Sequence, residues 1–79
     1  MNIIDHISEV SYSREGHFDT EEQYKEFKTL IESNISRDRL IVCNDDEIRI
    51  NVKDIPGIMV EVIKVFYDYS KGLIEGLII

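Results

Sequence analysis

The fold is decided between residues 19 and 35, which read DTEEQYKEFKTLIESNI. Asp19 or Thr20 can cap a helix here, and Thr20 with Gln23 makes a capping box. Apolar side chains then recur every three or four residues, which is the period of one helix face. They are Tyr24, Phe27, Leu30, Ile31 and Ile35. The stretch therefore predicts an amphipathic helix that ends near Asn34.

The residues that follow this helix predict a β-hairpin. Residues 40–43 are a short apolar run, LIVC, and residues 48–52 alternate apolar and polar side chains, as a half-buried strand does. Asn44, Asp45 and Asp46 lie between the two runs and favour a tight turn, because their side chains accept local backbone hydrogen bonds. A two-stranded hairpin is marginal alone, so we expect a third strand from the tail of the chain or from a second copy.

The segment 55–71 is compatible with two structures. Its content of Val, Ile, Phe and Tyr favours a strand, whereas its charged residues fall on one side of a helix at about 100° per residue. They are Glu61, Lys64, Asp68 and Lys71. We expect a helix with Asp54 as its cap, Pro56 in its first turn and Gly72 just past its end, and further strands are the alternative. Such a helix is apolar around most of its circumference, which predicts a central position or an oligomer contact.

The pattern at the two ends of the chain is weaker. Apolar residues at helical spacing predict a first short helix capped by Asn2, and they are Ile3, Ile4, Ile7 and Val10. Residues 11–17 predict a loop, although Val10 and Tyr12 also allow a short strand. Residues 73–79 predict a short C-terminal strand or an apolar tail. The sequence therefore indicates an α+β fold in a single domain, residues 1–79, with two N-terminal helices, a β-hairpin, a third apolar helix and a short final strand.

The composition describes a small acidic protein. The 79 residues carry sixteen acidic and nine basic side chains, a formal net charge of −7. This charge disfavours direct binding to nucleic acids and anionic membranes, which needs clustered Lys and Arg. A lone Cys43, the absence of a basic signal-peptide region in residues 1–10 and the charges that interrupt residues 55–79 predict a cytoplasmic protein that spans no membrane. Fourteen Ile with no Ala or Trp suggest an AT-rich genome, such as that of a low-GC bacterium or its phage.

The sequence holds little of the chemistry that enzymes need. His17, Asp19 and Glu21 bring metal-ligating side chains close together, but acids at a helix start are expected for capping alone. Cys43 ends an apolar run without an activating partner, and residues 45–47 lack the glycine and oxygen ligands of a calcium-binding loop. We therefore predict no catalytic residue, no metal, no cofactor and no enzyme activity.

The distinguishing property that remains is a negative surface, which favours contact with a basic surface of another protein. The candidate partner-binding residues lie before and on the predicted helix and at the hairpin tip. They are Glu15, Asp19, Glu21, Glu22, Glu26, Glu32, Asp45, Asp46 and Glu47. By analogy of size and charge alone, with no family motif, the first hypothesis is an inhibitor of a nucleic-acid-binding or defence protein, of the phage anti-defence, anti-CRISPR-like or DNA-mimic type. The alternatives are a homo-oligomeric structural or accessory protein that pairs through residues 55–79, and an antitoxin or nuclease immunity protein.

Overall fold

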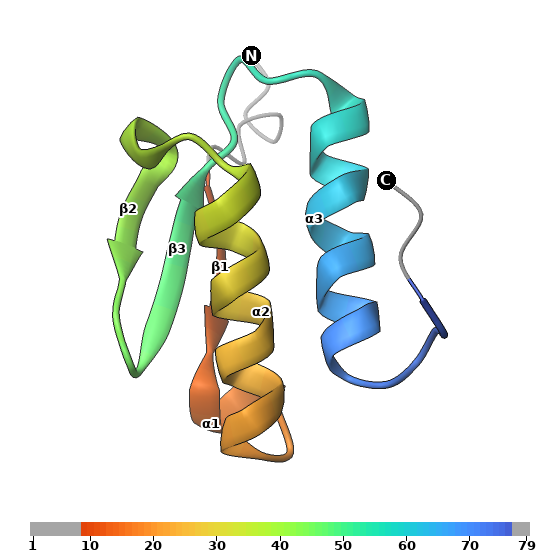
Figure 1. The fold of residues 1–79 in the computed structure, drawn as a ribbon. Coiled ribbons are helices and arrows are strands. Elements are labelled where there is room, and N and C mark those ends of the chain that lie inside the picture. The colour runs from red at the N-terminus through yellow and green to blue at the C-terminus, as the bar shows by residue number, and fades with distance from the viewer. Residues whose placement is uncertain (1–8, 77–79) are drawn as a thin grey trace, which may run out of the picture.

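The computed structural model describes residues 9–76, which form one three-stranded antiparallel sheet and the helices beside it (Figure 1). In chain order the elements are β1 (Glu9–Ser13), α1 (Arg14–His17), α2 (Glu21–Asn34), a 3₁₀ turn η1 (Arg37–Arg39), β2 (Leu40–Cys43), β3 (Glu47–Asn51) and α3 (Gly57–Ser70). The predicted α+β class is confirmed. Within this part of the chain, no helix combines the length and the apolar character that crossing a membrane requires.

The sheet has β3 at its centre, in the order β1-β3-β2. β1 pairs with β3 over its whole length, ending with Ser13 opposite Glu47. Ile48 and Ile50 are fully buried under the helices. Because side chains alternate along a strand, Glu47 and its alternate neighbours in β3 lie on the opposite face, which no helix of residues 9–76 covers.

The core lies between this sheet and two long helices. α2 lies across the sheet, and α3 lies beside α2 and runs in the opposite direction (Figure 1). α2 buries Tyr24, Phe27 and Ile31, and α3 buries Ile63 and Phe66. These side chains join the two buried isoleucines of β3 in a single cluster, so the face of α2 predicted to be apolar is the face that packs.

Aromatic rings close one end of the core and tie the segment between α1 and α2 to α3. The ring centroid of Phe18 lies 5.4 Å from that of Phe27 and 5.3 Å from that of Tyr67. Tyr12 of β1 lies 4.7 Å from Phe27. The Tyr67 hydroxyl donates to the backbone carbonyl of His17 at 2.9 Å. These contacts fix the start of α2, the helix that carries four of the nine predicted acidic residues.

The predicted limits of α2 are confirmed. The Thr20 side chain accepts a hydrogen bond from the Gln23 backbone N–H at 3.1 Å, and the last helical residue is Asn34. The Gln23 side chain accepts in turn from the backbone N–H of Asp19 at 2.9 Å, one residue further back than in the usual capping box. Both residues proposed as caps therefore take part in closing this helix end.

Residues 55–71 contain the helix that the one-sided charges indicated. Its N-cap is Pro56, so the predictions that Asp54 caps the helix and that Pro56 lies in its first turn are wrong. Asp54 instead has a φ of 65° and belongs to the chain reversal before the helix. Gly72 follows the helix with a φ of 79°, a left-handed conformation that suits glycine just past a helix end.

The loop predicted over residues 11–17 is wrong, because these residues form the end of β1 and the short helix α1. Val10 and Tyr12 pack against the core while their backbone pairs with β3. β1 is therefore the third strand that the hairpin needed, which the prediction had placed in the tail or in a second chain. The first predicted helix falls on residues before Glu9, which lie outside the described part, and its last residue, Val10, belongs to β1.

The described part of the tail, residues 71–76, contains turns and bends rather than the predicted strand, and residues 77–79 lie outside the described part. The expectation that α3 is central is also wrong among the described residues. Ile58 is 70% exposed and Leu73 65% exposed, because α2 and the sheet cover only one side of α3. Apolar surface thus remains uncovered by residues 9–76.

Candidate functional site

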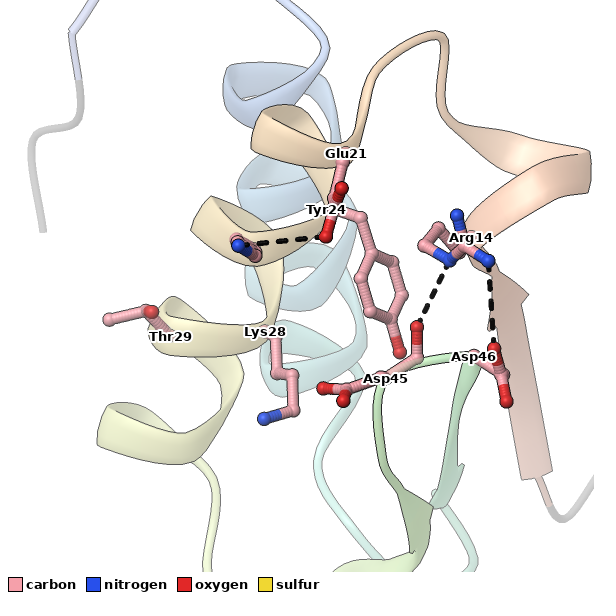
Figure 2. Close-up of a pocket in the computed structure, with 8 residues that line it drawn as sticks. Arg14, Glu21, Tyr24, Lys28, Thr29, Asp45 and Asp46 are labelled. Atoms are coloured by element: carbon pink, nitrogen blue, oxygen red, sulfur yellow. Dashed lines mark hydrogen bonds and ion pairs between the residues drawn. The ribbon is translucent and has the colours of Figure 1, made fainter.

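An open groove of about 690 Å³ separates α2 from the tip of the β2–β3 hairpin (Figure 2). It is lined by Arg14, Glu21, Tyr24, Lys25, Lys28, Thr29, Asp45 and Asp46. The first of these begins α1, the last two form the hairpin turn, and the others come from α2. Three lining residues belong to the predicted acidic set: Glu21, Asp45 and Asp46.

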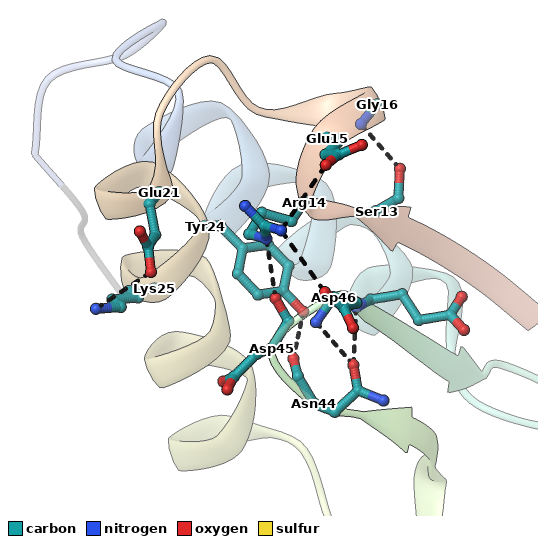
Figure 3. Close-up of polar contacts among 11 residues, drawn as sticks. Ser13, Arg14, Glu15, Gly16, Glu21, Tyr24, Lys25, Asn44, Asp45 and Asp46 are labelled. Carbon is teal, nitrogen blue, oxygen red and sulfur yellow. Dashed lines mark hydrogen bonds and ion pairs between the residues drawn. The ribbon is translucent and has the colours of Figure 1, made fainter.

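Arg14 fastens the start of α1 to the hairpin tip (Figure 3). Its Nε donates to the Asp45 carbonyl at 3.1 Å, and its Nη2 lies 3.6 Å from Asp46 Oδ1. Its backbone N–H donates to the Asp46 carbonyl at 2.8 Å. The tip itself is closed by Asn44, whose side-chain oxygen accepts from the backbone N–H groups of Asp46 and Glu47 at 2.8 and 3.0 Å. Arg14 therefore holds a turn that contains three acidic residues, Asp45, Asp46 and Glu47.

Tyr24 forms the floor of the groove and joins α2 to the same turn. Its ring points from the helix to the hairpin, and its hydroxyl donates to the Asn44 carbonyl at 2.6 Å (Figure 3). Burial, together with the smaller effects of Cys43 and the hairpin-tip carboxylates, raises the pKa of Tyr24 to about 12. The phenol therefore stays protonated and remains a donor throughout the physiological pH range.

The other cations of the groove are matched by carboxylates of α2. Lys25 Nζ lies 3.5 Å from Glu21 Oε2, an i, i+4 pair on the helix. Lys28 Nζ lies 3.6 Å from Glu32 Oε2. With Arg14, Lys25 and Lys28 against Glu21, Asp45 and Asp46, the groove lining carries equal numbers of positive and negative side chains. The groove is thus polar without an excess of negative charge.

Cys43 lies at the end of β2, beside Glu32. Its Sγ lies 3.6 Å from Glu32 Oε2. Burial raises the pKa of the Cys43 thiol, and the charge of Glu32 and its hydrogen bond to the thiol raise it further. A thiol held in its neutral form is a poor nucleophile, so its surroundings do not activate it for covalent catalysis.

Two further predicted residues, Glu15 and Glu47, lie away from the groove floor. Glu15 is on α1, 3.9 Å from Arg14. Glu47 is on the uncovered face of the sheet, where its Oε1 lies 3.6 Å from Arg49 Nη2. A nearby arginine therefore partly neutralises each of these two acids.

The outer side of α2 differs from the groove in its charge. Glu22 and Glu26 are exposed there, and Asp19 is exposed just before the helix begins. None of the three forms an ion pair with a cation of residues 9–76. At about 100° per residue, Glu22 and Glu26 point away from the face that buries Tyr24. We call these three residues the α2 acidic ridge. Of the predicted acidic set, the ridge is the part where negative charge is concentrated and left unneutralised by the described residues.

The metal arrangement considered for His17, Asp19 and Glu21 is absent. His17 Nδ1 accepts a hydrogen bond from the backbone N–H of Ser13 at 2.9 Å, so this ring nitrogen serves the end of β1. Nowhere in residues 9–76 do three His, Cys, Asp or Glu side chains converge as metal ligands.

Sequence reasoning missed the basic half of the groove and its tyrosine floor. Lys28 had a usable signal, since it forms an i, i+4 pair with Glu32 just as Lys25 does with Glu21. Arg14 had none, because its partners are about thirty residues away in the chain.

The chain matches no family model, and neither a curated protein nor a solved structure is significantly similar to it. Its function is therefore inferred from the arrangement of its own residues.

Proposed function

We propose that this protein is a small, cytoplasmic, acidic interaction module that inhibits a nucleic-acid-binding or defence protein by contacting its basic surface. The observation that supports the proposal is the α2 acidic ridge, Asp19, Glu22 and Glu26. These carboxylates are exposed and have no cation partner within residues 9–76. A surface of this kind attracts positively charged partners and speeds their association.

The ridge is more than a solvated helix face with balanced charges. Glu22 and Glu26 are four residues apart on one helix, so their Cβ atoms are about 6 Å apart and their like charges cost a few tenths of a kcal/mol. On the neighbouring side of the same helix, Lys25 and Lys28 are paired with Glu21 and Glu32. The lysines are thus placed where they leave the ridge negative. A cationic partner would relieve the repulsion along the ridge.

The ion pairs in the groove reduce the number of predicted acidic residues that are free to bind a partner. Asp46 and Glu21 are already paired within the molecule, whereas Asp45 forms no ion pair with residues 9–76. We therefore propose the ridge as the main contact, with Asp45 at its periphery. Among exposed charges, unpaired ones contribute most to attraction of a partner, and the effect weakens with salt.

The test is an affinity capture of the tagged full chain from a lysate of its host with nuclease added. We expect one basic nucleic-acid-handling protein that elutes at high salt and is lost with the double variant E22K/E26K. The matched control is E9K/E75K, which changes the net charge equally but lies outside α2. Equal loss of partner capture with both variants would mean that binding depends only on the net charge. Unchanged capture by E22K/E26K would refute the proposal. Inhibition is then measured as loss of the captured protein's nucleic-acid binding.

A second candidate is the homo-oligomeric protein that pairs through residues 55–79. The exposed apolar residues Ile58 and Leu73 favour it. This candidate predicts an apparent molecular mass that rises with protein concentration in sedimentation experiments. An antitoxin or immunity protein would use the same kind of acidic contact as the first proposal, and the identity of the captured protein, a toxin or a nuclease, separates the two.

A further inference from the structure

A partly open cavity of about 200 Å³ lies at the end of the molecule where α2 ends and α3 begins (Figure 1). Its apolar lining comes from three segments that are far apart in the sequence. They contribute Ile35 at the end of α2, Ile50 of β3, Ile55 just before α3 and Met59 in the first turn of α3. Ile35 is 8% exposed and Ile50 is fully buried, so the cavity reaches the edge of the core. We call it the end cavity.

Arg39 brings a positive charge to this apolar cavity. Its Nη1 donates to the backbone carbonyl of Lys53 at 2.6 Å, which holds the guanidinium in place. No carboxylate of residues 9–76 forms an ion pair with Arg39, and the adjacent Asp38 accepts instead from the Ser36 hydroxyl at 2.6 Å. A guanidinium has five N–H donors, so Arg39 keeps donors for a further acceptor.

Asn51 adds a second donor group to the lining of the end cavity. Its Oδ1 accepts from the backbone N–H of Lys53 at 2.9 Å, so its NH₂ group is the part left to bind. Arg39 and Asn51 therefore both contact the backbone of Lys53, and this shared anchor limits how far the two side chains can move. Donors that are already held in place lose less freedom when they bind an acceptor.

We propose that the end cavity binds a small carboxylate with an apolar body, about the size of a substituted benzoate. The apolar body would contact Ile50, Ile55 and Met59. The carboxylate would accept from Nε and Nη2 of Arg39, the paired geometry that suits a guanidinium. An apolar cavity of about 150 Å³ holds one benzene ring, so the end cavity admits one ring with a small substituent. This inference does not depend on the α2 acidic ridge and goes beyond the proposed function.

The charge of the whole protein makes a carboxylate a selective ligand. With a net charge of −7, the protein repels anions in general. Binding of a carboxylate therefore requires a local cation, and Arg39 is the one charged residue among the described residues that line the cavity. At physiological salt the screening length is about 8 Å, so direct contact with Arg39 outweighs the more distant acidic residues.

The test is a titration of the isotope-labelled full chain with para-toluate, followed by backbone amide NMR shifts at physiological salt. The matched ligand is para-toluamide, which has the same ring and no charge. We expect para-toluate to bind with a Kd of about 1 mM or below and para-toluamide to bind at least about fivefold more weakly. The largest shifts should fall on the amides of the end cavity, which are those of Ile35, Asn51, Ile55 and Met59.

The variant R39Q should weaken binding of para-toluate by about tenfold or more and leave binding of para-toluamide unchanged. Its matched control is R37Q, which removes the same charge at an exposed residue that does not line the cavity. We expect R37Q to bind para-toluate as the unchanged protein does. R39K should have an intermediate affinity, because lysine keeps the charge but lacks the planar pair of donors. Equal weakening by R37Q and R39Q would mean a general charge effect and would overturn the proposal.

Four further outcomes would also overturn it. The first is the absence of shifts at the cavity amides at concentrations well above the expected Kd. The second is equal affinity for the two ligands, because the cavity would then not select an anion. The third is much tighter binding of a short peptide that ends in leucine with a free carboxylate, which would point to the C-terminus of a partner protein. The fourth is a set of nuclear Overhauser contacts between Met59 and residues 1–8 in the ligand-free protein, because the chain itself would then fill the cavity.

None of these outcomes bears on the α2 acidic ridge, which partner capture with E22K/E26K tests separately. Failure of para-toluate to bind would therefore refute this inference and leave the proposed function in place.

Discussion

At the scale of single residues, Tyr24 connects the two elements that form the groove. Removing its hydroxyl in Y24F breaks the 2.6 Å hydrogen bond to the Asn44 carbonyl. We expect a loss of about 1 kcal/mol in the free energy of unfolding at pH 7, measured by urea denaturation. A loss near zero would mean that water replaces the phenol at the turn without cost.

The same residue makes stability depend on alkaline pH. In the unfolded chain the tyrosine ionises near its ordinary pKa of about 10, whereas burial raises the pKa of Tyr24 in the folded protein to about 12. The contribution is fully present below pH 10 and is lost as the pH rises from about 10 to 12, because only the unfolded state releases the proton there. Urea unfolding at pH 9, 10 and 11 should therefore show a steeper loss for the unchanged protein than for Y24F. Parallel curves would contradict the raised pKa.

The short helix α1 is sensitive to the contact between Gly16 and Ser13. The Ser13 hydroxyl accepts from the Gly16 backbone N–H at 3.1 Å and caps α1. A Cβ at position 16 would lie 2.5 Å from that hydroxyl oxygen, which must then rotate away. We expect G16A to cost about 0.5–1 kcal/mol in the unchanged protein and nothing or a slight gain in an S13A background. Equal effects in both backgrounds, measured by thermal denaturation, would rule out this clash.

At the scale of elements, the N-terminal cap of α2 is a measurable part of its stability. T20A removes the side-chain acceptor of the Gln23 N–H and should cost about 1 kcal/mol. T29A is the matched control, because Thr29 is exposed in the middle of the same helix and alanine has the higher helix propensity there. Chemical denaturation should therefore separate the two variants by more than about 1 kcal/mol. Similar stabilities would mean that the aromatic contacts hold this helix end without the cap.

The elements that sequence reasoning recovered are those whose signal is local. The spacing of Tyr24, Phe27 and Ile31 and the alternation through Ile48 and Ile50 describe α2 and β3 without knowledge of the rest of the chain. β1 was recovered only as the alternative to a loop, because its two inward side chains give a short pattern and its hydrogen-bond partner is far away in sequence. The sequence left a central position and an oligomer contact open for α3, since how much of a helix is covered depends on where its neighbours dock.

At the scale of the whole molecule, the small core leaves little reserve. F66A empties a fully buried position in α3 and should cost about 3–5 kcal/mol, most of what a domain of this size has. The adjacent V65A removes a partly exposed side chain and should cost less than about 1 kcal/mol. We expect the thermal midpoint to fall by at least about 15 °C in F66A and by only a few degrees in V65A. Similar midpoints would show that α3 is not docked through this face.

The sequence predicts which acidic residues belong to the site better than it predicts how they are arranged. The sequence identifies carboxylates on α2 and at the hairpin tip, but only the pairing of β1 with β3 brings Asp46 next to Arg14. The position of Glu22 and Glu26 away from the buried face follows from helix periodicity alone. Composition therefore predicted the sign of the surface, whereas the neutral groove depends on contacts between segments far apart in sequence.

The pairing of β1 with β3 has a consequence for synthesis on the ribosome. Ser13 leaves the ribosome about 34 residues before its partner Glu47. At translation rates of about 5–20 residues per second, the first strand waits roughly two to seven seconds without its partner. During that time its backbone is open to other nascent chains and to chaperones. The sheet is completed only when this early strand pairs with the later β3, so slowing translation between these positions should lower the yield of folded protein.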